Sequence, residues 1–430
     1  MGTEPDAAAM ASEAARLWQG GRHGEAIALF AALQARHPRD PAIALRLGIA
    51  QAMSGRLADA VGMLEHAVAL APENEDAHGW LGRTLATVHW QERAPAAIAP
   101  LRAYVAAQPD DPRRHMKLAV ALLSCGKLGE AWPHYAWRWP MFGDAIEGRV
   151  PEQPLEWPDP EAWRGRRLLV FAEQGFGDTL QFLRYVKSAA SAAGEVVLEV
   201  PRGLARLAAS VAPGVQVVSE GDDVPAYDAA VPMLHLPWAF GTELGTIPGT
   251  VPYLRADPAK VAPWRVRLAE LPGLKVGLVW AGDPRPDQTL AHRIDRRRSL
   301  RLSALAVLGR VPGVSLVSLQ KGAGALQAVV PPAGMMLHDW TAELGDFADT
   351  AALMQALDLV ITVDTACVHL AGALGRPVWL LNRYDSCWRW LRERDDSPWY
   401  PTLRQFRQDA PGEWGPVVAR VAAALAERVG

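Results

Sequence analysis

From Arg166 onward, the hydrophobic positions form short continuous runs that alternate with longer amphipathic segments. RLLVFA, EVVLEV and LKVGLV are such runs, and TLQFLRYVKSAAS and TAALMQALD are amphipathic segments of the same region. Short apolar runs that alternate with helical segments are typical of parallel strands in a sheet covered by helices. This part of the chain therefore predicts two doubly wound α/β domains that face each other, which we place at residues 166–272 and 273–430.

Before Arg166 the pattern differs, because the first third of the chain repeats itself. GRHGEA begins at Gly21, GRLADA begins 34 residues later at Gly55, and GKLGEA begins at Gly126. The second interval of 71 residues leaves room for a hidden copy, ERAPAA at Glu92. Further markers keep the same rhythm, namely Pro38, Pro72, Pro109, Gly48 and Gly82.

A 34-residue period with small residues at fixed offsets and a closing proline is the signature of tetratricopeptide repeats (TPRs). Each repeat is a pair of antiparallel helices, and several repeats must stack to bury their apolar faces. We predict about four repeats over residues 8–139, with a nonrepeating helical bundle as the alternative. Residues 140–165 are rich in Pro and Trp, which forbids a long helix and predicts a linker packed through its tryptophans.

Polar clusters follow four of the predicted strands at their carboxyl ends. EQGFGD follows LLVFA, WAGDP follows LKVGLV, SLQKG follows VSLV, and DTACVH follows LVITV. Doubly wound sheets bind ligands outside the carboxyl ends of their strands, and two such domains would place the ligand in an interdomain cleft. Four clusters from two domains therefore predict one shared ligand site.

The EQGFGD cluster combines two glycines with an acid at the start of a predicted helix. Gly175 and Gly177 allow backbone angles closed to other residues and let a ligand approach the main chain. Asp178 is then either a functional acid or an ordinary helix cap. The stretch contains neither the dinucleotide pattern GxGxxG nor the phosphate-binding pattern GxxxxGK[ST].

The segment DTACVHLAGALG predicts an anion site. Asp364 and Thr365 end a strand and lead into a helix that carries small residues. Free backbone N–H groups at a helix start attract anions, and small side chains permit close contact, so a pyrophosphate would fit there. His369 follows one turn later on the same helix face. The alternative is a buried structural histidine with Asp364 as the helix cap.

Three more features offer candidate residues for the ligand site. Gln320 and Lys321 of SLQKG would contact a phosphate or a base. The basic run at residues 296–298 either belongs to the site or is a solvated surface. The tryptophans of the last part of the chain either stack on a ligand or, as we expect, lie in the core; they are Trp388, Trp390 and Trp399.

Composition narrows the function classes. The 430 residues are half hydrophobic, and the net charge of -3 with mixed signs argues against general nucleic-acid binding. Three widely spaced cysteines form neither a CxxC site nor a disulfide framework, which fits a reducing compartment. The sequence shows neither a secretory signal nor a membrane span, which predicts a cytoplasmic protein. No cluster of possible ligands has the spacing of a metal site, so no bound metal is expected.

The order of these motifs resembles the bacterial tetratricopeptide-repeat glycosyltransferases. The stretches that carry the resemblance are FAEQGFGDTLQFLRYV, VWAGDP, RRRSL, VSLQKG, DFADTAALMQALDLVITVDTACVHLAGALGRPVWLL and SPWYPTLRQFRQ. The catalytic half is similar to the heptosyltransferases and, more remotely, to the protein O-GlcNAc transferases. The resemblance covers nearly the whole chain. It implies a GT-B fold, in which two Rossmann-like domains face each other and the C-terminal one holds most of a nucleotide sugar.

The resemblance also implies roles for individual residues. GFGD looks like the heptosyltransferase loop that carries the proposed base, which gives that role to Asp178. DTACVH looks like the DTGxxH motif that holds the donor diphosphate, with Ala366 where that motif often has Gly. Lys321 resembles a donor-contacting lysine. The complete set of candidates for binding the nucleotide sugar is Gln174, Gly175, Gly177, Trp280, Ser299, Gln320, Lys321, Asp364, Thr365, Ala366 and His369.

The reaction implied is transfer of a sugar from a nucleotide-sugar donor to a hydroxyl, with inversion and without a metal. The donor is a co-substrate, and no cofactor is expected. Some members of the family glycosylate flagellin, so the repeats are expected to bind a protein or peptide acceptor. Two alternatives stay open: a TPR scaffold with an inactive transferase-like half, and a transferase that acts on a glycan or a lipid-linked acceptor.

Overall fold

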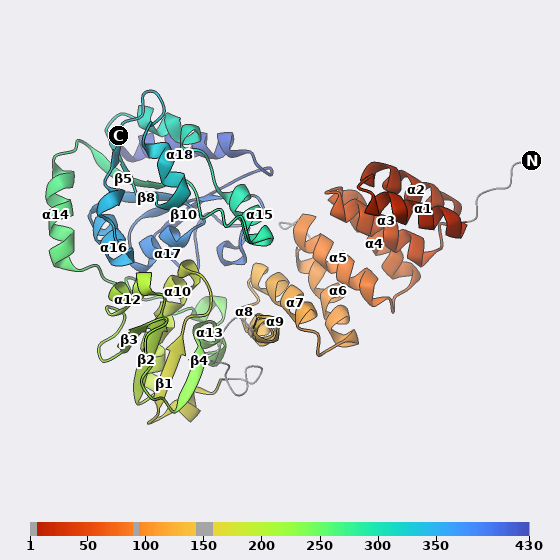
Figure 1. The fold of residues 1–430 in the computed structure, drawn as a ribbon, viewed down its shortest axis with the longest axis horizontal. Coiled ribbons are helices and arrows are strands. Elements are labelled where there is room, and N and C mark those ends of the chain that lie inside the picture. The colour runs from red at the N-terminus through yellow and green to blue at the C-terminus, as the bar shows by residue number, and fades with distance from the viewer. Residues whose placement is uncertain (1–6, 89–93, 143–157, 430) are drawn as a thin grey trace, which may run out of the picture. The chain divides into compact units, whose positions relative to one another are not determined.

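The structure is a computed structural model that describes residues 7–88, 94–142 and 158–429. The chain divides into two compact units, Met1–Ala145 and Ile146–Gly430. The described part of the first unit is helical, and the second unit contains two parallel sheets (Figure 1). The predicted fold class, a helical TPR region followed by parallel-sheet α/β domains, is confirmed. The predicted residue bounds of the domains stay predictions.

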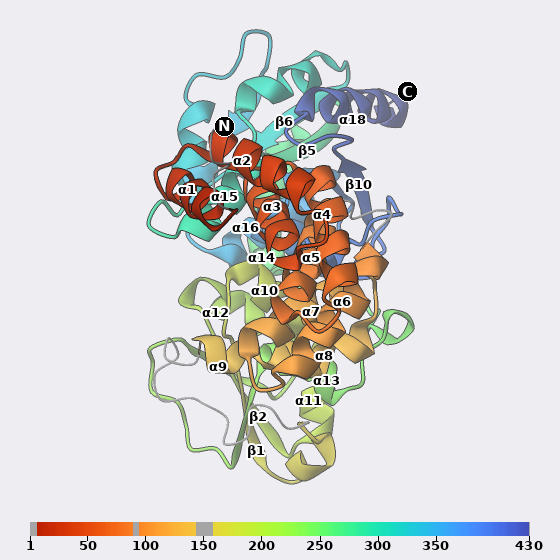
Figure 2. The ribbon, with the colours of Figure 1, turned by 90° about the vertical axis from the view of Figure 1, so that its right-hand side faces the viewer.

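The helices of the first unit pair in chain order, α1 with α2, α3 with α4, α5 with α6 and α7 with α8. The pairs stack side by side into a solenoid (Figures 1 and 2). A short helix, α9, follows the last pair. The bounds are α1 Ala7–Gln19, α2 His23–Arg36, α3 Pro41–Met53, α4 Leu57–Leu70, α5 Glu75–Val88, α6 Ala94–Ala107, α7 Pro112–Ser124, α8 Leu128–Ala136 and α9 Arg138–Phe142.

The repeated glycines mark the turns inside the helix pairs. Gly21, Gly55 and Gly126 have φ angles of 77°, 78° and 73°, in the left-handed region that favours glycine. Each repeat proline lies two residues beyond the end of the second helix of its pair. Glu92, the start of the hidden copy, lies outside the described residues. The 34-residue period therefore records a recurring turn, which is why the sequence predicts it well.

The inner glycines serve close helix packing, which makes a testable prediction. A methyl group at Gly48 would lie 2.7 Å from Leu64 Cγ, whereas Gly62 on α4 has no atom within 4 Å of that position. We expect Gly48→Ala to destabilise the TPR unit by about 1–3 kcal/mol through overpacking. Gly62→Ala is the matched control and should stabilise the unit by about 0.5–1 kcal/mol, because alanine favours the helix. Chemical denaturation of both variants measures the difference, and equal unfolding midpoints would contradict the packing role.

The second unit begins with a four-stranded parallel sheet in the order β3-β2-β1-β4. Its central strand β1 is buried at four of five positions because helices and neighbouring strands surround it. The strands are β1 Arg167–Phe171, β2 Glu195–Val200, β3 Gln216–Ser219 and β4 Ala229–Pro232. The α-helices of this part are α10 Phe176–Phe182, α11 Val186–Ala192, α12 Arg202–Ala208 and α13 Leu236–Ala239.

A six-stranded parallel sheet follows in the order β10-β9-β8-β5-β6-β7. Strands β8 and β9 are buried at every position, which explains their continuous apolar sequences. The strands are β5 Leu274–Val279, β6 Val314–Ser318, β7 Leu337–Asp339, β8 Leu359–Val363, β9 Val378–Asn382 and β10 Leu403–Arg407. The α-helices are α14 Pro258–Ala269, α15 Thr289–Arg298, α16 Phe347–Ala356, α17 Ala366–Ala373 and α18 Trp414–Val429.

Several of the described tryptophans are packed as core residues. Most of the predicted linker, residues 143–157, lies outside the described part of the chain. Trp163, near its end, is buried with its ring 6.1 Å from that of Phe240. The expectation that the later tryptophans lie in the core agrees with the structure, in which Trp388, Trp390 and Trp399 are all buried. In the described part of the chain, none of the helices combines the length and apolar character needed to cross a bilayer.

Candidate active site

The helix that follows β1 packs against the helix that follows β8. A methyl group at Gly177 on α10 would lie 3.0 Å from His369 Cδ2 and 3.6 Å from the Ala366 Cα, both on α17. The EQGFGD and DTACVH clusters, from different sheets, are therefore direct neighbours (Figure 1). Each cluster sits at the carboxyl end of its own strand, where doubly wound sheets bind ligands.

The reason for the glycines differs from the prediction. Gly175 precedes α10 with φ -70° and ψ 170°, a conformation open to any residue, and Gly177 lies inside the helix. The backbone freedom that the sequence attributed to the two glycines is therefore not used, and the predicted approach of a ligand to the main chain stays a prediction. Gly177 is needed for space instead, because a side chain there would meet the imidazole of His369. Gly175 and the neighbouring Gln174 are exposed in the loop between β1 and α10.

Asp178 forms an ion pair with Arg389, a residue of the segment after β9. The helix begins at Phe176, which places Asp178 in its first turn and not at the capping position. Its Oδ1 accepts a hydrogen bond from the Arg389 guanidinium, which also donates to Gln181 Oε1. The side chains of Asp178 and Arg389 are 24% and 10% exposed. The alternative that Asp178 is a helix cap is therefore excluded in this conformation.

Sequence reasoning missed Arg389. Its guanidinium also donates to Cys387 Sγ at 3.2 Å and lies 4.4 Å from the centre of the Trp388 ring. A signal was present in the sequence WRW, because an arginine between two tryptophans expected in the core needs a buried partner. The sequence does not identify that partner, because Asp178 lies 211 residues away along the chain, after a strand of the other sheet.

The start of α17 has the form expected for an anion site. Thr365 is the N-cap, and its hydroxyl accepts a hydrogen bond from the Cys367 N–H at 3.4 Å. The alternative role of Asp364 as the cap is therefore wrong. The Asp364 carbonyl accepts a hydrogen bond from Arg298 Nη1 at 2.9 Å, which fixes the strand end. Thr365 and Ala366 are partly exposed at the positive end of the helix dipole.

His369 is a buried histidine, as the alternative proposed. Its Nδ1 is hydrogen-bonded to Tyr400 Oη at 2.9 Å, and its ring stacks on Trp390 at 5.2 Å. Burial, reinforced by the positive charges of Arg389 and Arg184, lowers the pKa of His369 well below its ordinary value. The imidazole is therefore neutral near pH 7 and would not supply a positive charge to a diphosphate.

Gln320 and Trp280 hold the larger sheet together, and their predicted contacts with a ligand stay predictions. Gln320 Oε1 accepts hydrogen bonds from the N–H groups of Trp280 and Ala281, and its Nε2 donates to the carbonyls of Ala281 and Lys321. These bonds engage both donors of the amide and join the ends of β5 and β6. The Trp280 ring has no exposed surface, so this conformation leaves it no contact with a ligand.

Lys321 and Ser299 fix loops at the same sheet edge. The Lys321 ammonium donates to the carbonyls of Thr341 and Leu344, both at 2.8 Å, so one of its three N–H groups is not used by these bonds. Ser299 Oγ accepts a hydrogen bond from the Gly282 N–H at 3.0 Å. Both residues therefore act on the backbone of the loops, and their contact with a donor stays a prediction.

The basic run has mixed roles. Arg298 donates to the Asp364 carbonyl and forms an ion pair with Asp295, while Arg297 pairs with Asp385 at 2.6 Å. Arg296 is exposed. Only part of the run is thus a solvated surface. Within the described residues, no group of three or more His, Cys, Asp and Glu side chains is placed to hold a metal ion.

Arg184 joins the smaller sheet's side of the site to the end of the larger sheet. It is buried, and its guanidinium donates to the Trp399 carbonyl and to the Gln181 carbonyl, both at 2.9 Å. The guanidinium carbon also lies 4.9 Å from the ring centres of Tyr253 and Tyr400. Because Gln181 is on α10, these contacts help to fix the helix that carries Asp178.

Comparisons with known proteins agree with this architecture. A tetratricopeptide-repeat family model matches residues 17–83, and the model of glycosyltransferase family 9 (heptosyltransferase) matches residues 344–391, which include α16, α17 and Arg389. The class of protein is therefore a glycosyltransferase with a TPR region.

Similar proteins include one curated relative and solved structures of each part. Protein FlbA of Caulobacter vibrioides is 30% identical over 438 residues, which cover 94% of this chain and 70% of FlbA. The chain therefore belongs to the FlbA family. A family 9 glycosyl transferase from Veillonella parvula is 12% identical, with a TM-score of 0.45, over 62% of this chain and 97% of that one. The TPR protein YrrB is 22% identical, with a TM-score of 0.30, over 33% of this chain and 73% of that one.

Proposed function

We propose that this glycosyltransferase moves a sugar from a nucleotide-sugar donor to a hydroxyl of a protein, and that Asp178 is its general base. The observation that carries the proposal is the contact of α10 with the start of α17, where Gly177 lies against Ala366 and His369. It brings the helix that carries Asp178 against the first turns of α17. An acid next to an anion site is the arrangement that sugar transfer from a diphosphate requires.

The donor diphosphate would bind at the first turn of α17. Its charge is stabilised by backbone N–H groups at the positive end of the helix, with Thr365 shaping the turn. These fixed dipoles would also stabilise the charge that grows on the leaving nucleotide, so the proposed mechanism is independent of a metal. The neutral His369, one turn later, is held by its hydrogen bond to Tyr400.

Asp178 would take the proton of the acceptor hydroxyl. The acceptor oxygen then forms a bond to the anomeric carbon as the bond from that carbon to the diphosphate breaks, which inverts the configuration. Arg389 holds Oδ1 of the carboxylate, while Oδ2 accepts no hydrogen bond from the described part of the chain. One oxygen is thus oriented by the protein, and the other is available for the proton.

The repeats suggest that the acceptor is a protein, such as flagellin, because stacked helix pairs offer extended binding surfaces. Removal of residues 1–139 tests this. We expect the truncated enzyme to lose modification of the protein acceptor and to retain slow hydrolysis of the donor, measured by mass spectrometry and by nucleotide release. Unchanged modification would instead favour a glycan or lipid-linked acceptor.

Nucleotide release by the full chain, measured against a panel of nucleotide sugars, tests the activity itself. Thermal shift with the same panel reports binding of the donor separately. Stabilisation by one donor together with release of its nucleotide is the expected result. Absence of both for every donor would favour the alternative of a TPR scaffold with an inactive transferase half.

A further inference from the structure

The four most exposed large apolar side chains of the described chain gather in one short segment. They are Leu326, Val329, Val330 and Met336, which are 76%, 77%, 82% and 76% exposed. The next in order, Val266 on α14, is 69% exposed and belongs to another part of the unit. Single exposed apolar residues are ordinary, but several in one place mark an interaction surface.

The segment that carries these side chains, residues 326–336, is anchored to the core at two points. Ala328 and Met335 are both buried in the hydrophobic core of the larger sheet. Turns accompany both anchors, because the Val329 N–H donates to the Leu326 carbonyl and the Met335 N–H to the Pro332 carbonyl. A fixed backbone therefore presents the apolar side chains to solvent. We call this segment the apolar loop.

A 3₁₀ helix, Leu302–Arg310, packs beside the apolar loop at both of its ends. The Leu302 N–H donates to Gln327 Oε1 at 2.8 Å. A methyl group at Gly309, near the other end of this helix, would lie 2.8 Å from the Met335 Cα. The two ends of the helix are therefore fixed next to the apolar loop.

The charge at this surface is positive. Arg301 and Arg310, at the two ends of the 3₁₀ helix, are exposed, and neither forms an ion pair with another described residue. Residues 299–338 contain three lysines and arginines but neither aspartate nor glutamate. On the neighbouring α18, the exposed charges of the last turn are Glu427 and Arg428, which cancel.

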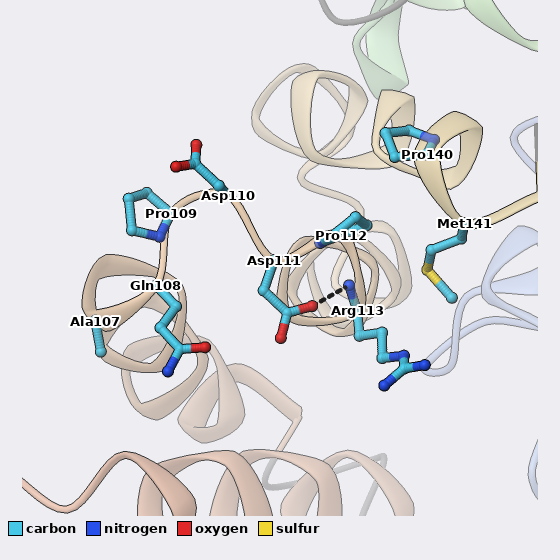
Figure 3. Close-up of a pocket in the computed structure, with 9 residues that line it drawn as sticks. All are labelled: Ala107, Gln108, Pro109, Asp110, Asp111, Pro112, Arg113, Pro140 and Met141. Carbon is cyan, nitrogen blue, oxygen red and sulfur yellow. Dashed lines mark hydrogen bonds between the residues drawn. The ribbon is translucent and has the colours of Figure 1, made fainter.

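A hollow of the first unit lacks this combination of apolar exposure and one sign of charge. It measures about 860 Å³ and lies between the α6–α7 loop and α9 (Figure 3). Asp110 and Arg113 are exposed there with opposite charges, and Asp111 accepts a hydrogen bond from the Arg113 N–H. Met141 is only 37% exposed. The hollow therefore favours no charged partner of either sign.

We propose that the apolar loop binds the surface of a membrane that contains anionic phospholipids. The four apolar side chains would insert among the acyl chains, and Arg301 and Arg310 would lie against the lipid phosphates. Apolar side chains beside basic residues are the composition that holds peripheral proteins in the interface of anionic membranes. Side chains that project separately into solvent suit insertion better than a closed pocket does.

A second copy of the chain is the competing occupant of this surface. A symmetric contact would place the same surface on both partners. It would bring Arg301 and Arg310 toward the arginines of the other copy, and residues 299–338 provide no acid to compensate them. An anionic membrane supplies that compensation, so the charge favours lipid.

The position of the apolar loop in the larger sheet would leave the candidate active site open. The loop leads directly into β7, which begins at Leu337, and so it reaches the amino edge of the parallel sheet. The polar clusters of the site lie at the carboxyl ends of the strands. Membrane binding therefore goes beyond the proposed sugar transfer and does not depend on it.

The test measures binding of the full chain to vesicles by co-sedimentation. The vesicles contain phosphatidylcholine alone or phosphatidylcholine mixed with phosphatidylglycerol. The wild type should bind the mixed vesicles, and a higher salt concentration should weaken this binding because salt screens the arginines. Failure of the wild type to bind the mixed vesicles at low salt would overturn the proposal.

Replacement of all four apolar side chains by serine should weaken binding to the mixed vesicles at least about tenfold. Because these side chains are mostly exposed, the melting temperature should change little. Arg265→Gln together with Val266→Ser, on α14, is the matched control, since it also removes an exposed arginine and an exposed apolar side chain. Equal binding by the serine variant and the wild type would contradict insertion of the loop.

Arg301→Gln together with Arg310→Gln should weaken binding to the mixed vesicles about 20–30-fold at low salt, or about fivefold for each arginine. Binding to phosphatidylcholine alone should hardly change. An equal loss on both kinds of vesicle would argue against the contact with lipid phosphates. Sedimentation velocity without vesicles tests the competing occupant, and a dimer that the serine variant abolishes would overturn the proposal in favour of a second copy.

Nucleotide release without vesicles separates this inference from the proposed activity. Both loop variants should release nucleotide at the rate of the wild type. Vesicle binding without nucleotide release from any donor would refute the transferase proposal and leave the membrane surface standing. Nucleotide release without vesicle binding would do the reverse.

Discussion

Asp178→Asn is expected to lower the rate of sugar transfer by about 10²–10⁴-fold, because the acceptor hydroxyl loses the group that takes its proton. The asparagine oxygen can still accept the hydrogen bond from Arg389, so the fold around α10 should persist. Donor binding should persist as well, since the proposed diphosphate site lies on α17. Steady-state transfer rates and a donor titration monitored by thermal shift measure the two effects separately.

Asp223→Asn is the control for this prediction, because Asp223 is an exposed acid of the same unit. It should leave both transfer and donor binding unchanged. If Asp178→Asn kept near-normal transfer while the protein melted at a lower temperature, Asp178 would be only half of a structural ion pair. The role of base would then pass to another residue.

Arg389→Met should lower kcat by about 10–100-fold, because the Asp178 carboxylate loses the contact that orients it. Arg389→Lys should recover little of the loss. The guanidinium contacts Asp178 and Gln181 through two different nitrogens, whereas lysine has one nitrogen on a flexible stem. The KM for the donor should change less than kcat if the residue acts through the base.

A double-mutant cycle tests whether Arg389 acts by positioning the Asp178 carboxylate or by stabilising the protein in general. Adding Arg389→Met to the Asp178→Asn protein should cost little further activity, because residues that act as a unit are not additive. Losses that multiply would show that Arg389 contributes independently of Asp178. Melting temperatures of all four proteins identify any variant whose lower rate comes from unfolding.

The sequence predicted the features that depend on local pattern. The 34-residue period located the turns at Gly21, Gly55 and Gly126, because each turn requires a left-handed residue. The rule that parallel sheets bind ligands at their carboxyl edge predicts that Asp178 and Thr365 lie in one region. Both predictions rest on constraints that act over a few residues or on the whole sheet.

Side-chain partners were harder to predict, because the main chain competes for the same groups. Gln320 and Lys321 are polar residues at a strand end, but backbone carbonyls and N–H groups of the larger sheet and its loops already occupy them. The roles of Arg389 and Arg184 could not be predicted because their partners are distant in the sequence. Their contacts join segments about two hundred positions apart, a relation that no single-sequence pattern records.

The contacts of Arg184 limit how this enzyme can be divided. Its guanidinium belongs to the smaller sheet's half but is held by Trp399 and Tyr400, near the final strand of the other half. A gene fragment that ends before Trp399 would therefore remove two of the groups that contact the Arg184 cation, next to the helix that carries Asp178. Split versions should regain transfer only when both fragments are produced together, so complementation between them would report the integrity of this junction.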